Sequence, residues 1–279
     1  MIPKVIHYCW FGGAALSDKE TACIDSWKKF LPDYEIRRWD ESNFNVSANR
    51  YAKEAYDRKK WAFVSDYARF KILYEYGGLY FDTDVELIKP IDDIIEKGAF
   101  FGLERTNNAS CYNAIAPGLG MGAEKGNAIY REILDYFEKA SFINPDGSDN
   151  TTTIVHTVTE IFSRHGFSSS ENIQVIHDIY LYPPEYFAPM EYYTGDLFIT
   201  ENTRSIHHYA ASWFTPEQKR LLETQHKLIR IFGRKAGKAL GDVYGVFARA
   251  YVKAKNKGLK YTFSYYVKLI GNLLKRGNT

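Results

Sequence analysis

The sequence predicts an α/β fold in which a mostly parallel sheet is flanked by helices and followed by a basic helical extension. Through residues 1–215, short apolar and aromatic segments alternate with stretches of helical periodicity, which is typical of a parallel sheet. The 279 residues are 45% hydrophobic and 25% charged, as in ordinary globular proteins. From residue 216 onward the pattern changes to charged amphipathic helices. We therefore expect one domain at residues 1–215 and a helical tail at residues 216–279.

The expected elements of the domain follow from hydrophobic periodicity and from glycine or proline stops. In the helix at residues 18–30, the spacing places Ala22, Trp27 and Phe30 on one face. In chain order, the sequence predicts a strand at 5–8, a helix at 18–30, a strand at 34–40, a largely helical stretch at 46–78 that stops at a Gly-Gly pair, a strand at 79–87, short strands and turns at 99–105 and 114–126, a helix at 126–140, a polar loop at 141–153, a helix at 157–166 and a strand at 173–184.

The tail is strongly basic. Residues 216–279 contain 15 Lys and Arg against 3 Asp and Glu, whereas residues 1–215 contain 21 against 31. Residues 217–232 and 261–276 each have an apolar stripe, and between them glycine recurs every four residues, from Gly233 to Gly245. That spacing favours either a glycine face for close helix packing or a flexible connector. The charge indicates that the tail meets an anionic surface, or else folds back onto the acidic domain.

Cysteine usage and hydropathy indicate a chain without disulfides or membrane spans. Three cysteines without a CxxC pair argue against a disulfide framework and a structural zinc site. The N-terminus lacks the basic and apolar regions of a signal peptide, and no window of about 18 apolar residues is present. These features favour a cytoplasmic protein, and we expect no nucleic-acid partner.

The stretch YFDTDVEL places Asp82 and Asp84 two positions apart at the end of a predicted strand. On a strand, both carboxylates would point to one side, where their repulsion favours a bound cation. Hard oxygen ligands select Mg²⁺ or Mn²⁺. A calcium-binding loop of the EF-hand type would need glycine where Leu87 stands, and an aspartyl-phosphate phosphatase would need threonine or valine where Glu86 stands. A solvated turn is the remaining alternative.

Two further groups of polar residues are candidates for the same site. Asp66 and Arg69 are three residues apart on a largely apolar helix, so they form either a surface ion pair or a partly buried pair that offers an acceptor to hydroxyls and a donor fork to a phosphate. In SIHHYAASW, His207 and His208 stand near Trp213. A neutral imidazole binds transition metals, although a packed or exposed histidine is the alternative.

Three segments together resemble glycosyltransferase family 32, the D-x-D sugar transferases. They are IPKVIHYCWFGG, the segment from WAFVSDYARF to YFDTDVELIKPID, and the segment from YPPEYFAPM to SIHHYAASW. The resemblance covers roughly residues 1–215, and its most specific part is S-D-x-x-R followed by Y-G-G-x-Y-x-D-x-D. It implies a GT-A fold with a Rossmann-like sheet, a nucleotide-sugar donor, and transfer with retention of the anomeric configuration.

The resemblance also implies roles for individual residues. Catalytic roles fall to Arg69, Asp82 and Asp84, with Mn²⁺ or Mg²⁺ as the cofactor. Asp66 and Arg69 would hold the hydroxyls of the donor sugar and the diphosphate, and Asp82 would contact the ribose or a metal-bound water. The metal would be held by Asp82, Asp84 and His208, and the choice between His207 and His208 stays open. The full set of donor-binding residues is Trp10 at the nucleoside base, Asp66, Arg69, Asp82, and Trp213 as a closing side chain.

These observations predict a metal-dependent retaining enzyme that moves a hexose from a nucleotide-sugar, by default UDP-linked, to a glycan or lipid-linked glycan in bacterial surface polysaccharide synthesis. No nucleophile is evident, which favours attack from the leaving-group face. The basic tail predicts peripheral association with the inner face of an anionic membrane. The alternatives are a D-x-D phosphatase or phosphotransferase, and a non-catalytic carbohydrate- or membrane-binding protein. Donor, acceptor, linkage and oligomeric state are not encoded in a recognisable way.

Overall fold

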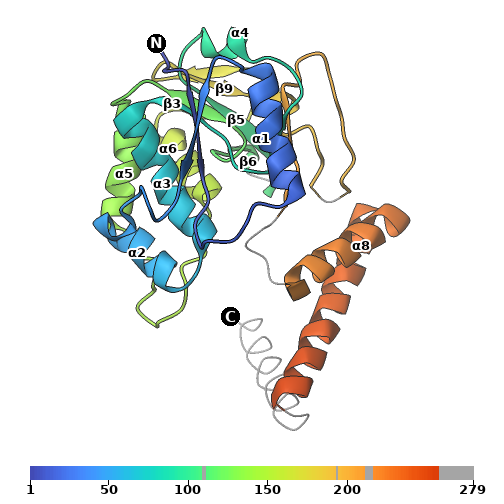
Figure 1. Cartoon of the computed structure of the whole chain (residues 1–279). Helices are drawn as coiled ribbons and strands as arrows, with labels where there is room; N and C mark the ends of the chain where they lie inside the picture. Colours follow the sequence, from blue (N-terminus) through green and yellow to red (C-terminus); the bar gives the residue numbers. More distant parts are fainter. Residues whose placement is uncertain (109–110, 193, 211–215, 258–279) are drawn as a thin grey trace. The chain divides into compact units, whose positions relative to one another are not determined.

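The computed structural model describes residues 1–279 except 109–110, 193, 211–215 and 258–279 (Figure 1). The chain divides into two compact units. The first comprises Met1–Glu191 and Asp196–Trp213, and the second comprises Tyr192–Gly195 and Phe214–Thr279. Each unit is considered by itself below.

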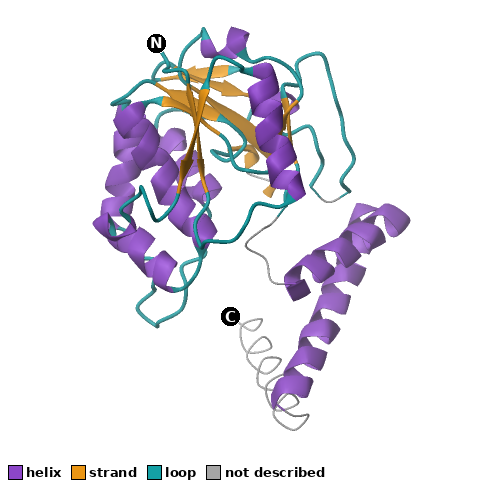
Figure 2. Ribbon diagram, in the orientation of Figure 1, coloured by secondary structure: helices purple, strands orange, loops and turns teal. Residues whose placement is uncertain are grey.

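A sheet of eight strands forms the centre of the first unit (Figure 2). Its strand order is β2-β1-β3-β7-β5-β9-β8, with β6 paired to β5. Parallel pairing joins β1 to β2, β1 to β3 and β5 to β9, whereas β7, β6 and β8 pair antiparallel with their neighbours, so five strands share one direction. The predicted α/β class with a mostly parallel sheet is therefore confirmed. The strands are β1 (Val5–Cys9), β2 (Glu35–Trp39), β3 (Gly78–Tyr80), β5 (Phe100–Asn108), β6 (Cys111–Ile115), β7 (Met121–Ala123), β8 (Gln174–Ile176) and β9 (Ile179–Tyr182).

Helices cover both faces of this sheet because its strands present apolar side chains on both sides. On β5, Phe100 and Phe101 point into different core clusters, as expected for a side-chain period of two. The helices α2 (Arg50–Asp57), α3 (Trp61–Tyr76), α5 (Ala128–Lys139) and α6 (Ile154–Arg164) pack on one face, whereas α1 (Asp18–Phe30), α4 (Asp92–Ile95) and α7 (Pro184–Phe187) pack on the other.

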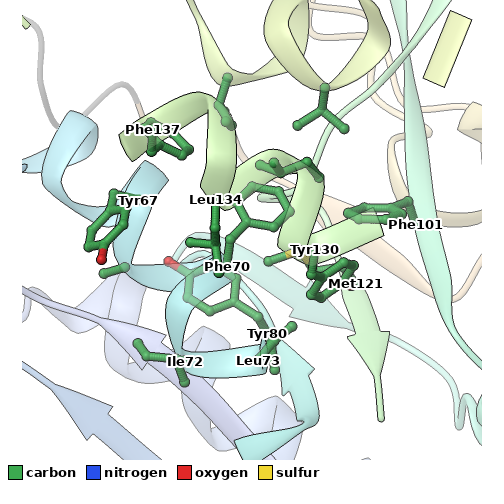
Figure 3. Close-up of a cluster of buried hydrophobic side chains, with 14 of the residues drawn as sticks. Tyr67, Phe70, Ile72, Leu73, Tyr80, Phe101, Met121, Tyr130, Leu134 and Phe137 are labelled. Carbon is green, nitrogen blue, oxygen red and sulfur yellow. The ribbon is translucent and has the colours of Figure 1, made fainter. Parts of the chain in front are cut away.

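Aromatic side chains fill the larger core cluster (Figure 3). Phe70 of α3 meets Tyr130 of α5 edge-on at a ring distance of 5.4 Å, and Tyr130 lies 5.5 Å from Phe101 of the sheet. All three side chains are completely buried. Fully burying an aromatic or large aliphatic side chain contributes about 1.5–3 kcal/mol, so this contact fixes α3 rigidly against the sheet. Most of the aromatic residues that are abundant in the sequence therefore serve the core.

A small second sheet carries two strands that bear on the candidate site. Strand β4 (Val85–Leu87) pairs antiparallel with β10 (Ser205–His207). Helix α1 fixes β4, since the indole of Trp27 donates to the carbonyl of Val85 at 2.7 Å and the hydroxyl of Ser26 accepts from the amide of Leu87 at 2.9 Å. The expected face of α1 is partly wrong, because Cys23, Ile24 and Trp27 are buried whereas Ala22 is exposed.

Two predicted strands are each divided into two. The strand expected at 79–87 ends at Tyr80 and resumes at Val85, so Asp82 and Asp84 lie on a tight turn in which the amide of Val85 donates to the carbonyl of Asp82. The idea that both aspartates share one face of a strand is therefore wrong. The strand expected at 173–184 is the hairpin of β8 and β9, whose turn residues His177 and Asp178 have φ of 48° and 60°. The stretch at 46–78 contains the 3₁₀ helix Val46–Ala48, α2 and α3.

The glycine pair after α3 is a steric requirement. Gly77 and Gly78 have φ of 66° and 106°, in the region that favours glycine. A Cβ atom on Gly78 would lie 2.6 Å from the carbonyl oxygen of Val5 in the neighbouring strand. The pair thus ends the helix and starts β3 in close contact with β1, as the sequence predicts.

In the second unit, α8 (Pro216–Lys257) consists of two helical segments that meet at Gly233, where φ is 76°. The two segments pack closely, since a Cβ on Gly237 would lie 2.3 Å from the Cα of Ile229 and one on Gly241 would lie 2.7 Å from Gln225. The glycine spacing therefore serves close helix packing. The second predicted stripe, at 261–276, lies outside the described residues. In the part of the chain that the structure describes, no helix is long and apolar enough to cross a membrane.

Candidate nucleotide-sugar site

The candidate site lies at the turn after β3, where Arg69 of α3 reaches the first aspartate of the D-x-D motif and Asp66 of the same helix pairs with Arg69. Asp66 and Arg69 are buried, with residue exposures of 8% and 4%. The Nη2 atom of Arg69 lies 3.2 Å from Oδ1 of Asp66 and 3.2 Å from Oδ1 of Asp82. The hydroxyl of Tyr80 donates to Oδ1 of Asp82 at 3.0 Å. Arg69 thus bridges two carboxylates, which is the buried alternative for the Asp66/Arg69 pair.

The protonation of this group follows from its burial. Burial raises the pKa of the Asp66 carboxyl to about 7, although the positive charge of Arg69 opposes the rise. Burial alone would lower the pKa of Arg69, but the charges of Asp82, Tyr80 and Asp66 hold it above its ordinary value. Arg69 is therefore a permanent cation beside two carboxyl groups, one of which titrates near neutrality.

The second aspartate of the motif faces the other way, toward β10. Oδ1 of Asp84 lies 3.2 Å from Nε2 of His207, and Oδ2 accepts a hydrogen bond from the amide of Ala210 at 2.8 Å. Burial tends to raise the pKa of Asp84, yet His207 and this amide hold it well below its ordinary value. Burial tends to lower the pKa of His207, and the charge of Asp84 more than compensates, so its pKa is raised. The two residues form an ion pair.

The neighbouring histidine does not lie against the motif. Nε2 of His208 is 2.8 Å from Oε2 of Glu86, and its side chain is 41% exposed. Only its backbone contacts the motif, through an amide that donates to the carbonyl of Asp84 at 3.0 Å. Of the two histidines that the sequence left open, the structure brings His207 to Asp84.

Trp10 and Trp213 are the two remaining donor-binding candidates. Trp10 follows β1 and is half-buried, and its indole donates to the carbonyl of Ala14 at 2.7 Å, which fixes it within its own loop. Trp213 lies outside the residues that the structure describes. Its expected role as a closing side chain stays a prediction.

Sequence reasoning missed three contributors to the site. Tyr80 is two positions before Asp82, a spacing that could have suggested their contact. Gly118 approaches so closely that a Cβ there would lie 1.9 Å from Oδ2 of Asp82, and its carbonyl accepts from the amide of Asp82. Glu104 of β5 lies within electrostatic reach of His207. No local pattern marks Gly118 or Glu104, because strand pairing between segments distant in sequence brings both of them to the site.

The side chains around the motif offer two of the ligands that a divalent cation needs. Within the described ranges, no group of three or more His, Cys, Asp and Glu side chains is arranged to hold a metal ion. Asp84 and His207, however, place an oxygen and a nitrogen 3.2 Å apart. Two ligands that lie at right angles and about 2.1 Å from one ion are separated by about 3 Å. The pair therefore fits two adjacent positions of a Mg²⁺ or Mn²⁺ shell, which such ions complete with phosphate oxygens and water.

The region of the chain that carries the motif matches a family of sugar transferases. Residues 17–101 match the family model for the "glycosyltransferase sugar-binding region containing DXD motif", which spans α1 to the start of β5 and includes Asp66, Arg69, Asp82 and Asp84. The resemblance to family 32 is thereby confirmed at the level of its D-x-D region, and a bacterial capsular type is not established by this match.

Curated relatives are also sugar transferases. An uncharacterized glycosyltransferase of Acanthamoeba polyphaga mimivirus is 26% identical over 201 residues, which are 69% of this chain and 75% of the viral protein. Inositol phosphoceramide mannosyltransferases 3 and 1 of Schizosaccharomyces pombe are 30% and 29% identical over 149 and 110 residues. The matched regions cover 50% and 36% of this chain but only 38% and 33% of the fungal enzymes.

Among solved structures, the chain is similar to two glycosyltransferases. The PaToxG glycosyltransferase has a TM-score of 0.41 and 19% identity, covering 58% of this chain and 68% of that one. A glycosyltransferase involved in the glycosylation of the major capsid of PBCV-1 has a TM-score of 0.43 and 13% identity, covering 79% of this chain and all of that one. Both scores are below 0.5, so the assignment rests on the sequence matches and on the site.

Proposed function

We propose that this protein is a metal-dependent glycosyltransferase that moves a hexose from a nucleotide-sugar, by default UDP-linked, to a glycan or lipid-linked glycan. The observation that carries the proposal is the turn at residues 82–84, which joins the buried Asp66/Arg69 pair on one side to the Asp84/His207 pair on the other. A donor diphosphate needs positive charge, and the donor sugar needs hydrogen-bond acceptors. Arg69 supplies the positive charge and the carboxylates of Asp66 and Asp82 supply the acceptors, all in contact around the turn at residues 82–84.

The side chains divide the work by charge. Arg69 would donate to the diphosphate as negative charge develops on the leaving group, and its burial makes that interaction strong. Asp66 and Asp82 would accept hydrogen bonds from hydroxyls of the donor. Asp84 and His207 would hold Mn²⁺ or Mg²⁺, which acts on the diphosphate as a Lewis acid. The lone pair that His207 would give to a metal requires its neutral form, so metal binding would release the proton that His207 holds in its ion pair with Asp84.

We propose transfer with retention of the anomeric configuration. The support is the resemblance to retaining family 32 enzymes, and attack from the leaving-group face would let the departing phosphate oxygen take the proton of the acceptor hydroxyl. Nuclear magnetic resonance of the product, recorded before mutarotation, distinguishes the two outcomes. An inverted product contradicts this part of the proposal and leaves the transferase assignment intact.

A panel of UDP- and GDP-sugars tests the activity. We expect one donor to be hydrolysed or transferred in the presence of Mn²⁺, with loss of turnover on addition of a chelator. The substitution Asp84→Asn should cause a comparable loss, and Asp33→Asn, at a carboxylate whose side chain is 79% exposed, is the matched control. The absence of metal-dependent turnover with every donor would argue against the proposed function.

We also propose that the second unit binds an anionic membrane surface, where a lipid-linked acceptor would be found. Residues 216–257 contain 11 Lys and Arg against 3 Asp and Glu. Large apolar side chains are exposed on the same unit, among them Ile231 at 71%, Phe232 at 55% and Phe247 at 69%. Exposed apolar residues among basic ones are typical of helices that lie in a membrane interface.

Co-sedimentation with vesicles tests this surface. The full chain should pellet with phosphatidylserine-containing vesicles and much less with pure phosphatidylcholine. The double substitution Ile231→Ser and Phe232→Ser should reduce pelleting, whereas Val175→Ser, at a side chain in the first unit that is 54% exposed, should not. Equal pelleting of all three proteins would exclude this surface as the contact.

A further inference from the structure

Glu104 lies level with the D-x-D motif along the strands. In the strand order, the motif stands between Trp10 and Glu104. The pairing register places Tyr80 of β3 opposite Met121 of β7, and Met121 opposite Phe101 of β5. Two residues onward along both chains, Asp82 is level with Leu103, and one residue further Thr83, in the middle of the motif, is level with Glu104. On the other side, His7 of β1 pairs with Tyr80, so Trp10 lies in the same row.

Glu104 points to the face of the sheet that carries the second sheet of β4 and β10. Phe100 stacks on Phe187 of α7 at a ring distance of 5.7 Å, and a Cβ on Gly102 would lie 3.0 Å from the Cβ of Phe187. Because side chains alternate along a strand, Glu104 is the next residue on that face.

Strand β10 reaches the same place from the other side of Phe187. The hydroxyl of Ser205 donates to the carbonyl of Phe187 at 3.3 Å, and His207 follows two residues later. Glu104 and His207 therefore each stand two positions beyond a contact with Phe187. The electrostatics agree with this geometry, since burial raises the pKa of Glu104 while the charge of His207 opposes the rise.

Glu104 differs from the other carboxylates of the site because, among the residues that the structure describes, no side chain or amide is bonded to it and it has only a longer-range electrostatic interaction with His207. Asp82 accepts from Arg69 and Tyr80, and Asp84 is paired with His207 and an amide. Across the described residues, the side chain of the half-buried Glu104 takes part in no hydrogen bond or salt bridge, whereas its backbone pairs with Ala114 of β6. A carboxylate that is partly removed from water without a partner is costly, and such groups commonly serve a ligand.

The row across the sheet orders these groups along an extended donor. Trp10 follows β1, the motif follows β3, and Glu104 stands on β5, with β7 between them. Neighbouring strands are about 4.8 Å apart, so the two strand spacings from β3 to β5 place Glu104 about 10 Å from the motif in the direction across the strands. If the nucleoside of the donor lies at Trp10 and its diphosphate at the motif, the sugar extends from the diphosphate toward Glu104.

We propose that Glu104 binds a hydroxyl group of the sugar moiety of the donor and thereby contributes to the choice of the transferred sugar. This inference rests on the proposed function. In this proposal Glu104 differs in role from Asp84, Arg69 and Trp10, which would bind the nucleoside diphosphate part of the donor. Glu104 contacts the sugar alone, so its loss should affect the intact nucleotide-sugar and spare the nucleoside diphosphate.

Titration calorimetry with matched ligand pairs tests this distinction. Each nucleotide-sugar of a UDP and GDP panel is titrated with Mn²⁺ into the full chain, next to the corresponding nucleoside diphosphate. For the pair that binds most tightly, Glu104→Ala should weaken nucleotide-sugar binding about tenfold, as expected for a hydrogen bond to a charged group, and should change nucleoside diphosphate binding less than twofold. Glu104→Gln, which keeps a hydrogen-bonding oxygen, should recover part of the loss.

Two controls keep the outcomes distinct. Glu124→Gln removes a carboxylate that follows β7 and pairs with the N-terminal amine, and both affinities should stay unchanged. Circular dichroism and melting temperature establish that the Glu104 variants fold. If the wild-type chain binds no nucleotide-sugar, the proposed function fails, and this inference fails with it. If it binds and Glu104→Ala leaves both affinities unchanged or weakens both equally, only the assignment of Glu104 is overturned.

Discussion

The Oδ1 atom of Asp84 lies 3.2 Å from the Nε2 atom of His207, so the last residue of the D-x-D motif and the last residue of β10 meet at one point. The contact depends on the pairing of β4 with β10, in which Val85 stands opposite His207. Beyond β10, Tyr209 has a φ of 47° and turns the chain so that the amide of Ala210 also reaches Asp84. The pairing register of β10 and the alternation of side chains along a strand account for which of the two adjacent histidines reaches the motif.

Substitution of the two histidines should therefore have unequal effects. We expect His207→Gln to raise the Mn²⁺ concentration for half-maximal turnover at least tenfold, the lower end of what is lost when an element of a metal site is removed. His208→Gln breaks a contact with Glu86 at a half-exposed side chain and should have a much smaller effect. Turnover measured over a range of Mn²⁺ concentrations checks this, and a larger effect in His208→Gln would restore His208 as the ligand.

The approach of Gly118 to Asp82 gives a second prediction. The methyl group of Gly118→Ala would lie 1.9 Å from Oδ2 of Asp82 and 3.2 Å from Nη1 of Arg69, so the Asp82 carboxylate must rotate away from Arg69 and Tyr80. A misplacement of about 1 Å at a reacting centre can cost about a hundredfold in rate, while overpacking costs about 1–3 kcal/mol of stability. Turnover and urea denaturation separate the two effects.

Gly166→Ala is the matched control for this variant. Gly166 has φ of 95° with open space around its Cβ position, so alanine strains the backbone without touching the site. We expect a stability loss of the same order with unchanged turnover. Equal turnover in Gly118→Ala and wild type would show that Asp82 need not hold its present orientation.

The parts of this molecule that the sequence predicts are those that depend on local pattern. Helix α3 and its glycine stop follow from periodicity, and Asp66 and Arg69 follow from their spacing on that helix. The sequence predicts a strand through residues 82–84, whereas the structure has a turn there, because contacts with α1 and β10, which are distant in sequence, displace β4 into a second sheet. Local pattern carries no information about such pairings.

Glu104 illustrates the same limit. In the segment AFFGLER it is one charged residue at the end of an apolar run, and nothing nearby suggests a role. Its position beside the motif is set by the register of β3, β7 and β5. Strand register is determined by contacts between segments that are far apart in the chain, so the residue emerges only in three dimensions.

Asp66 should lower the stability of the protein at neutral and alkaline pH. Its folded-state pKa is raised to about 7 from 3.8. Its contribution to stability is therefore fully present below pH 3.8 and is lost as the pH rises through about 7. We expect Asp66→Asn to be more stable than wild type at pH 8, by up to roughly 4 kcal/mol at 1.36 kcal/mol per pKa unit, and to lose transferase activity because an amide NH₂, which cannot accept from a donor hydroxyl, replaces one of the two carboxylate oxygens.

Urea denaturation at pH 5 and pH 8 checks the Asp66 prediction. The advantage of Asp66→Asn should be larger at pH 8 than at pH 5. Asp57→Asn, at a carboxylate whose side chain is 56% exposed and paired with Lys53, should show no such pH dependence. A variant that is less stable than wild type at pH 8 would mean that the ion pair with Arg69 outweighs the cost of burying the charge.

His7 should make the fold sensitive to acid. It is completely buried, its Nδ1 accepts from the indole of Trp39 at 3.0 Å, and its Nε2 then carries the proton given to the carbonyl of Gly77 at 3.0 Å. A second proton on Nδ1 would face the N–H of Trp39, and burial lowers the pKa of His7 to about 4 from 6.5. Since the unfolded chain takes up this proton first, stability is present above pH 6.5 and is lost as the pH falls toward 4.

Comparing wild type with His7→Gln by urea denaturation isolates this contribution, because the carboxyl groups titrate in both proteins. Between pH 6.5 and pH 4, wild type should lose roughly 3 kcal/mol more of its unfolding free energy than the variant does, from the shift of about 2.5 pKa units. The variant itself should be less stable at pH 7, since glutamine cannot keep both hydrogen bonds in the same geometry. His156→Gln, at a side chain that is 69% exposed, should retain the wild-type acid dependence. If His7→Gln loses stability in acid as steeply as wild type does, protonation of His7 is not what destabilises the fold in acid.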